Sequence, residues 1–288
     1  MNITFAQTFL EVLASGNLNR AAERLNVTQS TVTTRINALE AELGQQLLVR
    51  NRSGAQVTAA GFKFQRFAEM LVQTWKQARH EISLPKAFES ACTIACHFEL
   101  WDGVGEGWCT GMRKHNPQVA LSVWPGEHAD INRWLDSGLV DAALVLDVHP
   151  RNAWSVRALM EDQLIQVATR QRDVMRWDPD YVYVDHGADF RRQHAAAYPV
   201  EETAAVSFGH SAWALKFILK HGGSGYLPAR VVSEHLAAGR LYRVNGAVSF
   251  ARTAYLVSND AITRDWPWFE KSFASGNFAF SQDFDPHA

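Results

Sequence analysis

Apolar residues in the first eighty positions recur at intervals of three and four, the spacing that places them along one face of an α-helix. Residues 3–14 predict a first helix of this kind, and Gly16 is a residue that favours the helix end. Its apolar face consists of Phe5, Phe9, Val12 and Leu13. We expect this helix to contribute to a small helical core.

Residues 19–43 predict two further helices that meet at a sharp corner. The first is short and has small residues on one face, and Asn26 and Val27 form the corner. The second has an apolar stripe with steps of four, three and four, which predicts burial of Val32, Ile36, Leu39 and Leu43. Thr28 is placed to cap this helix by accepting a hydrogen bond from a free backbone N–H.

The opposite face of the second helix is polar and carries no carboxylate before Glu40. Its amides, hydroxyls and Arg35 can approach a phosphate backbone without repulsion and present hydrogen-bonding groups to base edges. The pattern favours a helix-turn-helix motif at about residues 18–37 whose second helix enters the major groove. The alternative is a helical hairpin of an all-α domain that does not bind DNA.

After Gly44, residues 47–50 and 56–57 predict two short strands joined by a turn. Such a wing would bring basic residues to the DNA backbone or the minor groove. The residues expected to contact DNA in the helix and the wing are Thr28, Gln29, Ser30, Thr31, Thr33, Thr34, Arg35, Asn37, Arg50, Arg52 and Ser53.

Residues 59–82 predict one long helix. Its apolar stripe consists of Phe64, Phe67, Leu71, Trp75, Ala78 and Ile82. A stripe of this length outside a three-helix core has to be buried against something. A second copy of the helix and the chain's own C-terminal part are the two alternatives. Residues 83–85 end the helix and serve as a hinge between domains.

From residue 87 onward, short apolar runs alternate with helical segments. Strands are expected at residues 92–96, 119–123, 142–146, 181–184, 206–208, 225–227, 241–244 and 251–257. Helices are expected near residues 101–115, 129–137, 190–197, 211–221, 228–238 and 264–274. Strand–helix–strand order with short links predicts two α/β lobes with parallel strands, joined by crossovers near residues 169–171 and 259–263.

Residues 1–84 resemble the N-terminal module of the LysR-type transcriptional regulators. The stretch FLEVLASGNLNRAAERLNVTQSTVTTRINALEAELGQQLLVR, followed by VTAAG, matches the family pattern without a gap. Ser30 stands where the family commonly has proline, and Thr33-Thr34 replaces its common Ser-Arg pair. The stretch TWKQAR at residues 74–79 is similar to the subgroup of the H-NS-dependent flagellar regulator.

The resemblance implies an α+β multi-domain chain with three parts. Residues 1–58 would form a winged helix-turn-helix DNA-binding domain, and residues 59–86 a linker helix that pairs antiparallel with its twin in a dimer. Residues 87–288 would form a two-lobed α/β effector-binding regulatory domain resembling a periplasmic binding protein. Lobe I would comprise residues 87–168 and 264–288, and lobe II residues 169–263.

Ligands of open α/β sheets bind where the carboxyl ends of strands and the starts of helices converge. The effector-binding residues expected on this basis are His97, Phe98, Glu99, Trp101, Trp124, Glu127, Asp147, Phe208, His210 and Tyr226. Carboxylates and indoles in such a cleft favour a cationic or aromatic molecule over an organic acid. The alternative is that Glu99 faces solvent or pairs with an arginine, and that aromatic side chains partly fill the cleft.

Charge and composition agree with this organisation. The chain has 288 residues and a formal net charge of −2, which divides into +3 for residues 1–85 and −5 for the remainder. The positive balance of the N-terminal part is modest, so tight DNA binding would require two modules held together. No apolar run is long enough to span a bilayer and no basic, then apolar leader is present, which predicts a cytoplasmic protein without a membrane partner.

The sequence gives little support for catalysis or metal binding. Cys92, Cys96 and Cys109 form no C-x-x-C pair, and small buried residues are favoured over a redox-sensing pair. The scattered histidines lack metal-ligand spacing, and we expect no metal. The chain also lacks a nucleophile elbow and a glycine-rich phosphate loop. We therefore expect no enzyme and no cofactor apart from a small-molecule effector of unknown identity.

Together these features predict a homodimeric or homotetrameric transcription regulator that binds an interrupted, A/T-biased inverted repeat in double-stranded DNA. RNA polymerase is a further partner that such a role allows. One alternative is a ligand-free architectural or nucleoid-associated DNA-binding protein. Another is a solute-binding or enzymatic α/β domain for which the helical module is only a dimerisation device.

Overall fold

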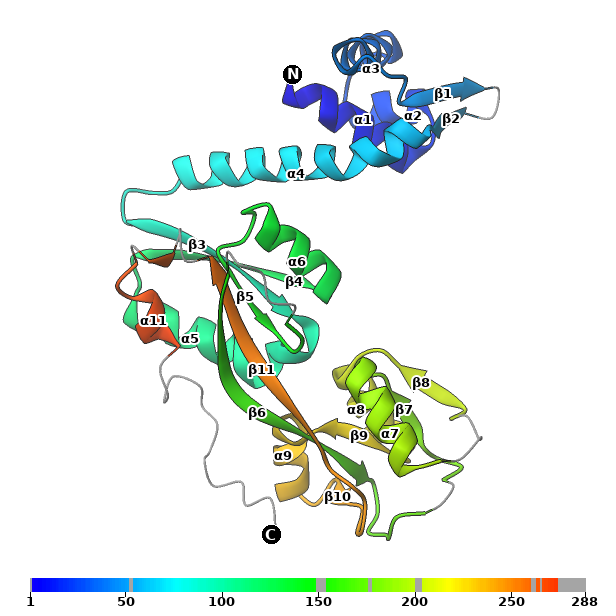
Figure 1. Ribbon diagram of the computed structural model, residues 1–288, viewed down its shortest axis with the longest axis vertical. Coiled ribbons are helices and arrows are strands. Elements are labelled where there is room, and N and C mark those ends of the chain that lie inside the picture. The colour runs from blue at the N-terminus through cyan, green and yellow to red at the C-terminus, as the bar shows by residue number, and fades with distance from the viewer. Residues whose placement is uncertain are drawn as a thin grey trace. The chain divides into compact units, whose positions relative to one another are not determined.

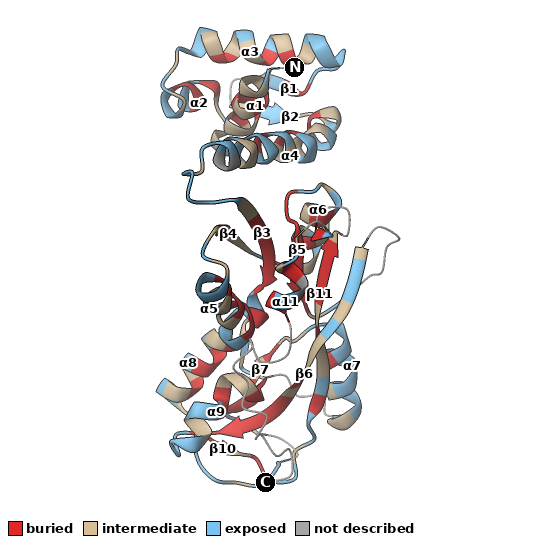
Figure 2. Ribbon diagram, turned by 90° about the vertical axis from the view of Figure 1, so that its left-hand side faces the viewer, coloured by how far each residue is buried: buried red, intermediate tan, exposed pale blue. Residues whose placement is uncertain are grey.

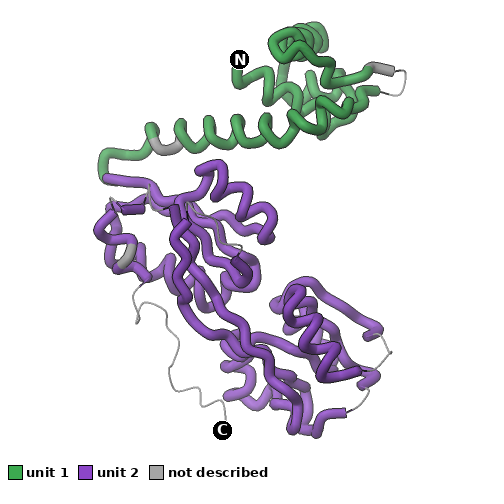
Figure 3. Tube along the Cα trace, viewed as in Figure 1, with its two compact units in different colours: residues 1–87 green, residues 88–288 purple. Residues whose placement is uncertain are grey.

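The computed structural model describes residues 2–51, 54–148, 154–175, 178–199, 204–259, 263–264 and 266–273. The chain divides into two compact units, Met1–Ala87 and Phe88–Ala288, which are described separately (Figures 1 and 3). No helix of the described residues is both long and apolar enough to cross a membrane.

Unit 1 begins with three helices around one core: α1 (Ile3–Ser15), α2 (Leu18–Arg24) and α3 (Gln29–Leu43). The corner between α2 and α3 lies at Asn26, whose φ of 53° is the left-handed conformation that asparagine tolerates better than most residues. Val32, Ile36 and Leu39 are buried as expected, but Leu43 is 40% exposed. Leu43 is the last residue of α3, one turn beyond Leu39, which is the last residue of this helix in the buried core.

The predicted wing is present as the antiparallel pair β1 (Leu48–Asn51) and β2 (Gly54–Val57). Glu40 on α3 positions the start of β1, because Oε1 of Glu40 accepts hydrogen bonds from the backbone N–H groups of Leu47 (2.7 Å) and Leu48 (3.0 Å). The carboxylate that ends the polar face of α3 therefore has a structural role.

The long helix α4 (Ala59–Ile82) has the bounds that the sequence predicts. Thr58 caps it by accepting from the N–H of Gly61 at 3.0 Å. Gly61 is required by close packing, since a Cβ at this position would lie 2.3 Å from the carbonyl oxygen of Leu47 and 2.6 Å from Cγ2 of Val57. The first half of α4 packs against α1 and β2, while much of its length is exposed (Figure 2).

Unit 2 contains a mixed sheet with helices on both sides (Figure 1). Its strands are β3 (Ser90–His97), β4 (Val119–Gly126), β5 (Ala142–Val145), β6 (Trp154–Ala168), β7 (Val182–Val184), β8 (Val206–Phe208), β9 (Ser224–Pro228), β10 (Tyr242–Arg243) and β11 (Phe250–Asn259). Its helical segments are η1 (Phe98–Leu100), η2 (Trp101–Gly105), α5 (Glu106–His115), α6 (His128–Asp136), α7 (Ala188–Ala197), α8 (Ser211–His221), α9 (Ala229–Ala237) and α11 (Phe269–Ser272).

Seven strands form one sheet in the order β10-β6-β11-β5-β3-β4, and β9 pairs with β6 beside this path. The pairs β3–β4, β3–β5 and β7–β8 are parallel, as the strand–helix–strand pattern predicts. The pairs of β11 with β5 and β6, and of β6 with β9 and β10, are antiparallel. The sheet is therefore mixed and not wholly parallel.

The two long strands β6 and β11 connect the two halves of unit 2. Strand β6 pairs with β11 from Trp154 to Leu164, and with β9 from Leu164 to Ala168. The sequence predicts crossovers near residues 169–171 and 259–263 and assigns no element to residues 154–168, whereas the structure makes the connection through β6 and β11. Charged residues interrupt the apolar pattern of β6, so this pattern does not predict a strand.

Separate apolar cores occupy the two halves. One half, here called lobe I, contains β3, β4, β5, α5 and α6, with Ile94, Trp108 and Leu144 among its buried residues. The other, here called lobe II, contains β7, β8, β9 and α7–α9, with Val184 and Ile218 among its buried residues. Polar residues that link these two lobes can respond to a change in their relative position.

Candidate functional site

The outer face of α3 is polar and open to solvent. Thr28 begins the helix, and its Oγ1 accepts from the backbone N–H of Thr31 at 3.2 Å, as expected of a cap. The exposed side chains of this segment are Thr28, Gln29, Ser30, Thr34 and Asn37, and Thr31 and Thr33 are half-buried. This face can present hydroxyl and amide groups to DNA bases.

Arg35 differs from the outward orientation that the sequence suggests. It is half-buried, and its guanidinium donates a hydrogen bond from Nη1 to Oγ1 of Thr8 on α1 at 3.3 Å. Thr8 itself is fully buried. Arg35 thus lies at the seam between α3 and α1, where it contacts the core of unit 1 as well as the solvent.

The predicted wing contacts are only partly described. Arg50 lies in β1 opposite Ala55, within the strand and not at the turn. Arg52 and Ser53, together with the side chain of Arg50, lie outside the described residues. Their contact with DNA stays a prediction.

An exposed apolar stripe runs along α4. The side chains of Phe67, Leu71 and Trp75 are 46%, 40% and 48% exposed, at successive intervals of four residues. Phe64 does not belong to this stripe, because its ring packs 5.4 Å from that of Phe9 in the core of unit 1. Ala78 is half-buried. Ile82, the last residue of the predicted stripe, is 87% exposed. The exposed part of the predicted stripe therefore excludes Phe64 and contains Ala78 only in part.

In unit 2, three strand ends meet as expected. His97 ends β3, and its ring lies 4.4 Å from the ring of His128, which follows β4. Nε2 of His97 lies 3.5 Å from a carboxylate oxygen of Glu127. Asp147, beyond β5, donates its backbone N–H to Nε2 of His128 at 2.9 Å. These contacts place residues from all three strand ends side by side.

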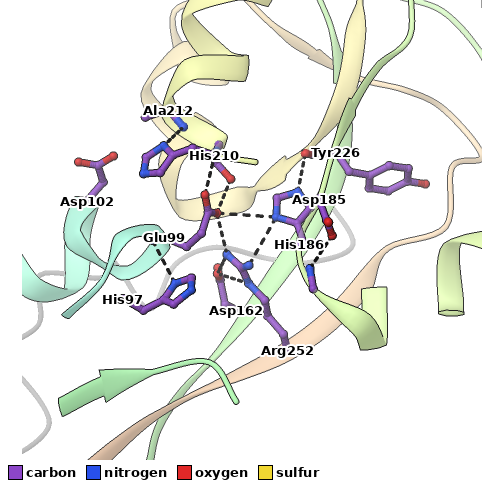
Figure 4. A network of polar contacts seen from close by, with 12 residues as sticks. His97, Glu99, Asp102, Asp162, Asp185, His186, His210, Ala212, Tyr226 and Arg252 are labelled. Carbon is purple, nitrogen blue, oxygen red and sulfur yellow. Dashed lines mark hydrogen bonds and ion pairs between the residues drawn. The ribbon is translucent and has the colours of Figure 1, made fainter. Parts of the chain in front are cut away.

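Glu99 lies at the centre of a buried polar network that connects the lobes (Figure 4). One carboxylate oxygen accepts from the backbone N–H of Ser211 at 2.6 Å, and the other accepts from the Ser211 hydroxyl. The second oxygen also lies 3.6 Å from Nη2 of Arg252. The side chain of Glu99 is only 5% exposed. Glu99 therefore pairs with an arginine, which was the alternative to an effector contact in the sequence analysis.

Two arginines and a second carboxylate complete the network. Arg252 on β11 donates from Nε (3.0 Å) and Nη2 (2.9 Å) to Asp162 on β6. Arg230 on α9 lies 3.4 Å from the same carboxylate. Arg230 also donates to the backbone carbonyl oxygens of Glu99 and Asp102, the latter at 2.9 Å. The network thus contains two carboxylates and two guanidinium groups.

His186 occupies the remaining side of Glu99. Its Nε2 donates to the backbone carbonyl of Tyr226 at 2.9 Å, since a carbonyl can only accept. Its Nδ1 lies 3.5 Å from Arg252 and 3.7 Å from Glu99. Burial alone would raise the pKa of Glu99, but the neighbouring His186 and the two hydrogen bonds from Ser211 outweigh it and hold this pKa well below its usual range. Glu99 is therefore ionised at neutral pH.

Several expected effector-binding residues pack within their own lobes. Trp124 lies edge to face with Trp134 (5.5 Å), and Phe208 packs against Phe217 (5.4 Å). Tyr226 is 1% exposed, and its hydroxyl contacts Tyr198 and donates to the carbonyl of Val248, both at 2.7 Å. Its ring points away from Glu99 (Figure 4). The Tyr226 hydroxyl thus bonds to residues of lobe II, and its contact with an effector stays a prediction.

Two other expected aromatic residues, and a histidine, remain near the network. The ring of Phe98 lies 6.2 Å from that of His210, which precedes α8. Trp101 is 40% exposed in η2. Phe98 and Trp101 are close to Glu99 in sequence, and His210 precedes Ser211. Contact of these three residues with an effector stays a prediction.

One group among the described residues has the composition of a metal site. Ligand atoms of His97, Glu127 and His128 lie within 4.8 Å of one another. The hydrogen bonds oppose this use, because Nδ1 of His97 accepts from the N–H of Glu99 (3.3 Å) while Nε2 of His128 accepts from Asp147. One nitrogen of each ring is therefore already engaged by a backbone N–H group. The absence of a metal at these residues stays a prediction.

The cysteines belong to the interior of lobe I. Cys92 and Cys96 are buried free thiols on β3, and burial raises the pKa of Cys96 to about 12. A thiol with such a pKa stays protonated and is a poor nucleophile. Both residues act as small apolar side chains of the core.

The sequence did not point to most members of the network around Glu99, which are Asp162, His186, Ser211, Arg230 and Arg252. Asp162 lies on β6, the strand that was not predicted. A signal was present at Arg252, a single charge in the apolar run of β11. A charge in such a run predicts a buried counter-ion, but the sequence does not identify which carboxylate provides it.

Comparisons with known proteins agree with this architecture. Residues 3–62 match the model of the bacterial regulatory helix-turn-helix protein of the lysR family, and residues 106–262 match the LysR substrate binding domain. The chain belongs to the LysR family. It is a LysR-type DNA-binding transcription regulator with a substrate-binding domain.

Curated relatives of this LysR-family chain include the HTH-type transcriptional regulator HdfR of Escherichia coli K12 and of Shigella boydii. Each is 25% identical over 273 residues, which cover 92% of this chain and 96% of the relative. This agrees with the subgroup resemblance at residues 74–79.

Solved structures show the same fold. The LysR family regulator CbnR matches with a TM-score of 0.72 at 17% identity, covering 95% of this chain and 96% of CbnR. DarR of Vibrio fischeri, solved in complex with DNA, matches with a TM-score of 0.56 at 20% identity, covering 95% of this chain and 97% of DarR.

Proposed function

We propose that this LysR-type regulator reads its operator through the exposed face of α3. The observation that carries the proposal is the division of this helix into two faces, with Val32, Ile36 and Leu39 buried and Gln29, Ser30, Thr34 and Asn37 open to solvent. A helix held this firmly can place short polar side chains against base edges in the major groove. The wing after α3 contacts the backbone through Arg50, Arg52 and Ser53.

The regulator acts as a dimer formed through α4. Phe67, Leu71 and Trp75 form an exposed apolar stripe on a helix of 24 residues, and an antiparallel twin helix covers it. Two linked modules compensate for the modest positive charge of each and select an interrupted, A/T-biased inverted repeat. Assembly of two dimers into a tetramer and contact with RNA polymerase extend this proposal, which places the protein with the DNA in the cytoplasm.

Unit 2 supplies regulation. The LysR substrate-binding domain of this chain transmits the relative position of its two lobes to the DNA-binding modules, and an effector that prefers one position changes DNA binding. The Glu99 network supports this role, because it connects residues of both lobes and of the two strands between them.

Binding measurements with variants of α3 test the proposal. Gln29→Ala removes an exposed amide at the start of α3, and we expect the preference for the operator over unrelated DNA to fall by about tenfold, because one bidentate base contact contributes roughly 1–3 kcal/mol. Binding to unrelated DNA should change little. Gln73→Ala, an exposed glutamine on α4, is the matched control. Equal behaviour of the two variants would contradict the assignment of α3.

A further inference from the structure

The first turn of α8 is occupied by a carboxylate of the chain itself. The N-terminus of a helix attracts anions, because its first N–H groups have no partner within the helix and carry a partial positive charge. In helix α8 of 11 residues, the N–H and hydroxyl of Ser211 both donate to Glu99. A free anion would make the same two contacts at this position.

The charges around Glu99 are already balanced. Arg252 and Arg230 face Glu99 and Asp162, and the four side chains are between 1% and 11% exposed. Burial of an unpaired ion is costly, and here two carboxylates face two guanidinium groups. A free carboxylate entering this network would add an uncompensated negative charge, and a cation would add a positive one.

The same contacts join the two lobes. Glu99 follows β3 of lobe I, whereas Ser211 begins α8 of lobe II. Arg230 of α9 in lobe II donates to the backbone carbonyl oxygens of Glu99 and Asp102 in lobe I. Removing the Glu99 carboxylate would therefore remove interactions that hold the lobes together.

We propose that Glu99 is a built-in ligand of the regulatory domain, which fills the anion position at the start of α8 and holds the lobes together without an effector. The inference rests on the proposed regulatory role of unit 2 and specifies the ligands that this position excludes. It makes the protein insensitive to small carboxylates at this position. Replacement of Glu99 by a residue without a carboxylate opens the position to small carboxylates such as formate and acetate.

Rescue by a free carboxylate tests the proposal. We expect full-length Glu99→Ala to unfold at a lower temperature than the wild type, and acetate or formate to raise its Tm with the logarithm of their concentration, at constant ionic strength with chloride as the reference anion. The wild type should show no such rise. Glu106→Ala is the matched control, because Glu106 is an exposed carboxylate in the first turn of α5.

Hydrogen exchange gives a readout specific to the site. Peptides that contain the start of α8 should exchange faster in Glu99→Ala than in the wild type, and acetate should slow them again. Glu99→Gln keeps an oxygen that can accept from Ser211 but lacks the charge that faces Arg252. We expect it to be less stable than the wild type and unresponsive to acetate.

Three results would overturn the inference: stabilisation of the wild type by acetate, a Glu99→Ala variant as stable as the wild type, or the absence of any acetate response in a folded Glu99→Ala protein. If Glu99→Ala does not fold, two results still test the inference. Stabilisation of the wild type by acetate, or a Glu99→Gln variant as stable as the wild type, would overturn it. The proposed function is tested separately, by DNA selection with the wild type. A missing acetate response would therefore contradict the inference alone, whereas a lack of sequence preference would contradict the proposed function.

Discussion

Arg35 lies between α3 and α1, where its guanidinium can contact both Thr8 and a DNA phosphate. Its hydrogen bond to Thr8 holds the guanidinium near the protein surface, where it can also approach a phosphate. It is the only basic residue in α3, so it provides the only charge of this helix that can attract the DNA backbone.

Arg35→Ala should weaken binding to all DNA sequences alike and reduce the slope of log K against log salt by about one, the change expected for one lost phosphate contact. Thr8→Val is the matched control, because it removes the oxygen that Arg35 contacts and leaves the guanidinium in place. Fluorescence anisotropy at several salt concentrations measures both variants. An unchanged salt slope in Arg35→Ala would show that Arg35 makes no phosphate contact.

His97 predicts a pH dependence of stability. Burial, with a further contribution from His128, lowers its pKa from 6.5 to about 4 in the folded state. The unfolded state therefore binds more protons between these values, so the stability from His97 is complete above about pH 6.5 and is lost as the pH falls towards 4. The loss is at most about 3 kcal/mol. Glu99 acts in the same direction, but at lower pH, because its pKa is lowered in the folded state.

His97→Gln should flatten this dependence while its side-chain oxygen can still accept from the N–H of Glu99. Urea unfolding at pH 7 and pH 5 measures the difference, and His115→Gln on the exposed face of α5 is the control. His194 and His235 also have lowered pKa values, so a smaller slope should remain. The account of His97 fails if the variant and the wild type lose the same free energy of unfolding over this range.

Among the elements, helices were more predictable than strands. The bounds of α4 follow from a cap, a periodic pattern and a proline, all of which are local in sequence. Strand β6 could not be found in this way, because its first part is largely exposed, its last part is buried and it carries Arg157, Glu161 and Asp162. Its pairing is with β9, β10 and β11, which are distant in sequence.

The apolar stripe of α4 predicts a dimer that a single charge disrupts. Leu71→Asp places a carboxylate in the middle of the stripe, and we expect the dimer to dissociate at a concentration at least tenfold higher than in the wild type, since burial of an unpaired charge is costly. Gln73→Asp introduces the same charge at another exposed position of α4 as a control. Sedimentation equilibrium measures both, and equal dissociation constants would exclude Leu71 from the interface.

At the scale of the whole molecule, the candidate sites differ in how far the sequence predicts them. The DNA-binding face follows from one helix, where residues three or four apart share a side. The Glu99 network combines residues from η1, β6, α8, α9 and β11, so their meeting depends on the complete fold of unit 2. The sequence placed Glu99 and the segment before α8 in one region, but it did not predict that they would bind each other.

The central claim is that this LysR-family chain is a specific regulator that reads DNA through α3. The most direct test is selection of genomic DNA fragments by the purified full-length protein at near-physiological salt, followed by sequencing. The account predicts that bound fragments share an interrupted, A/T-biased dyad and that Gln29→Ala weakens this preference. Broad binding without a shared sequence, lost on a modest increase in salt, would contradict it and favour an architectural DNA-binding protein.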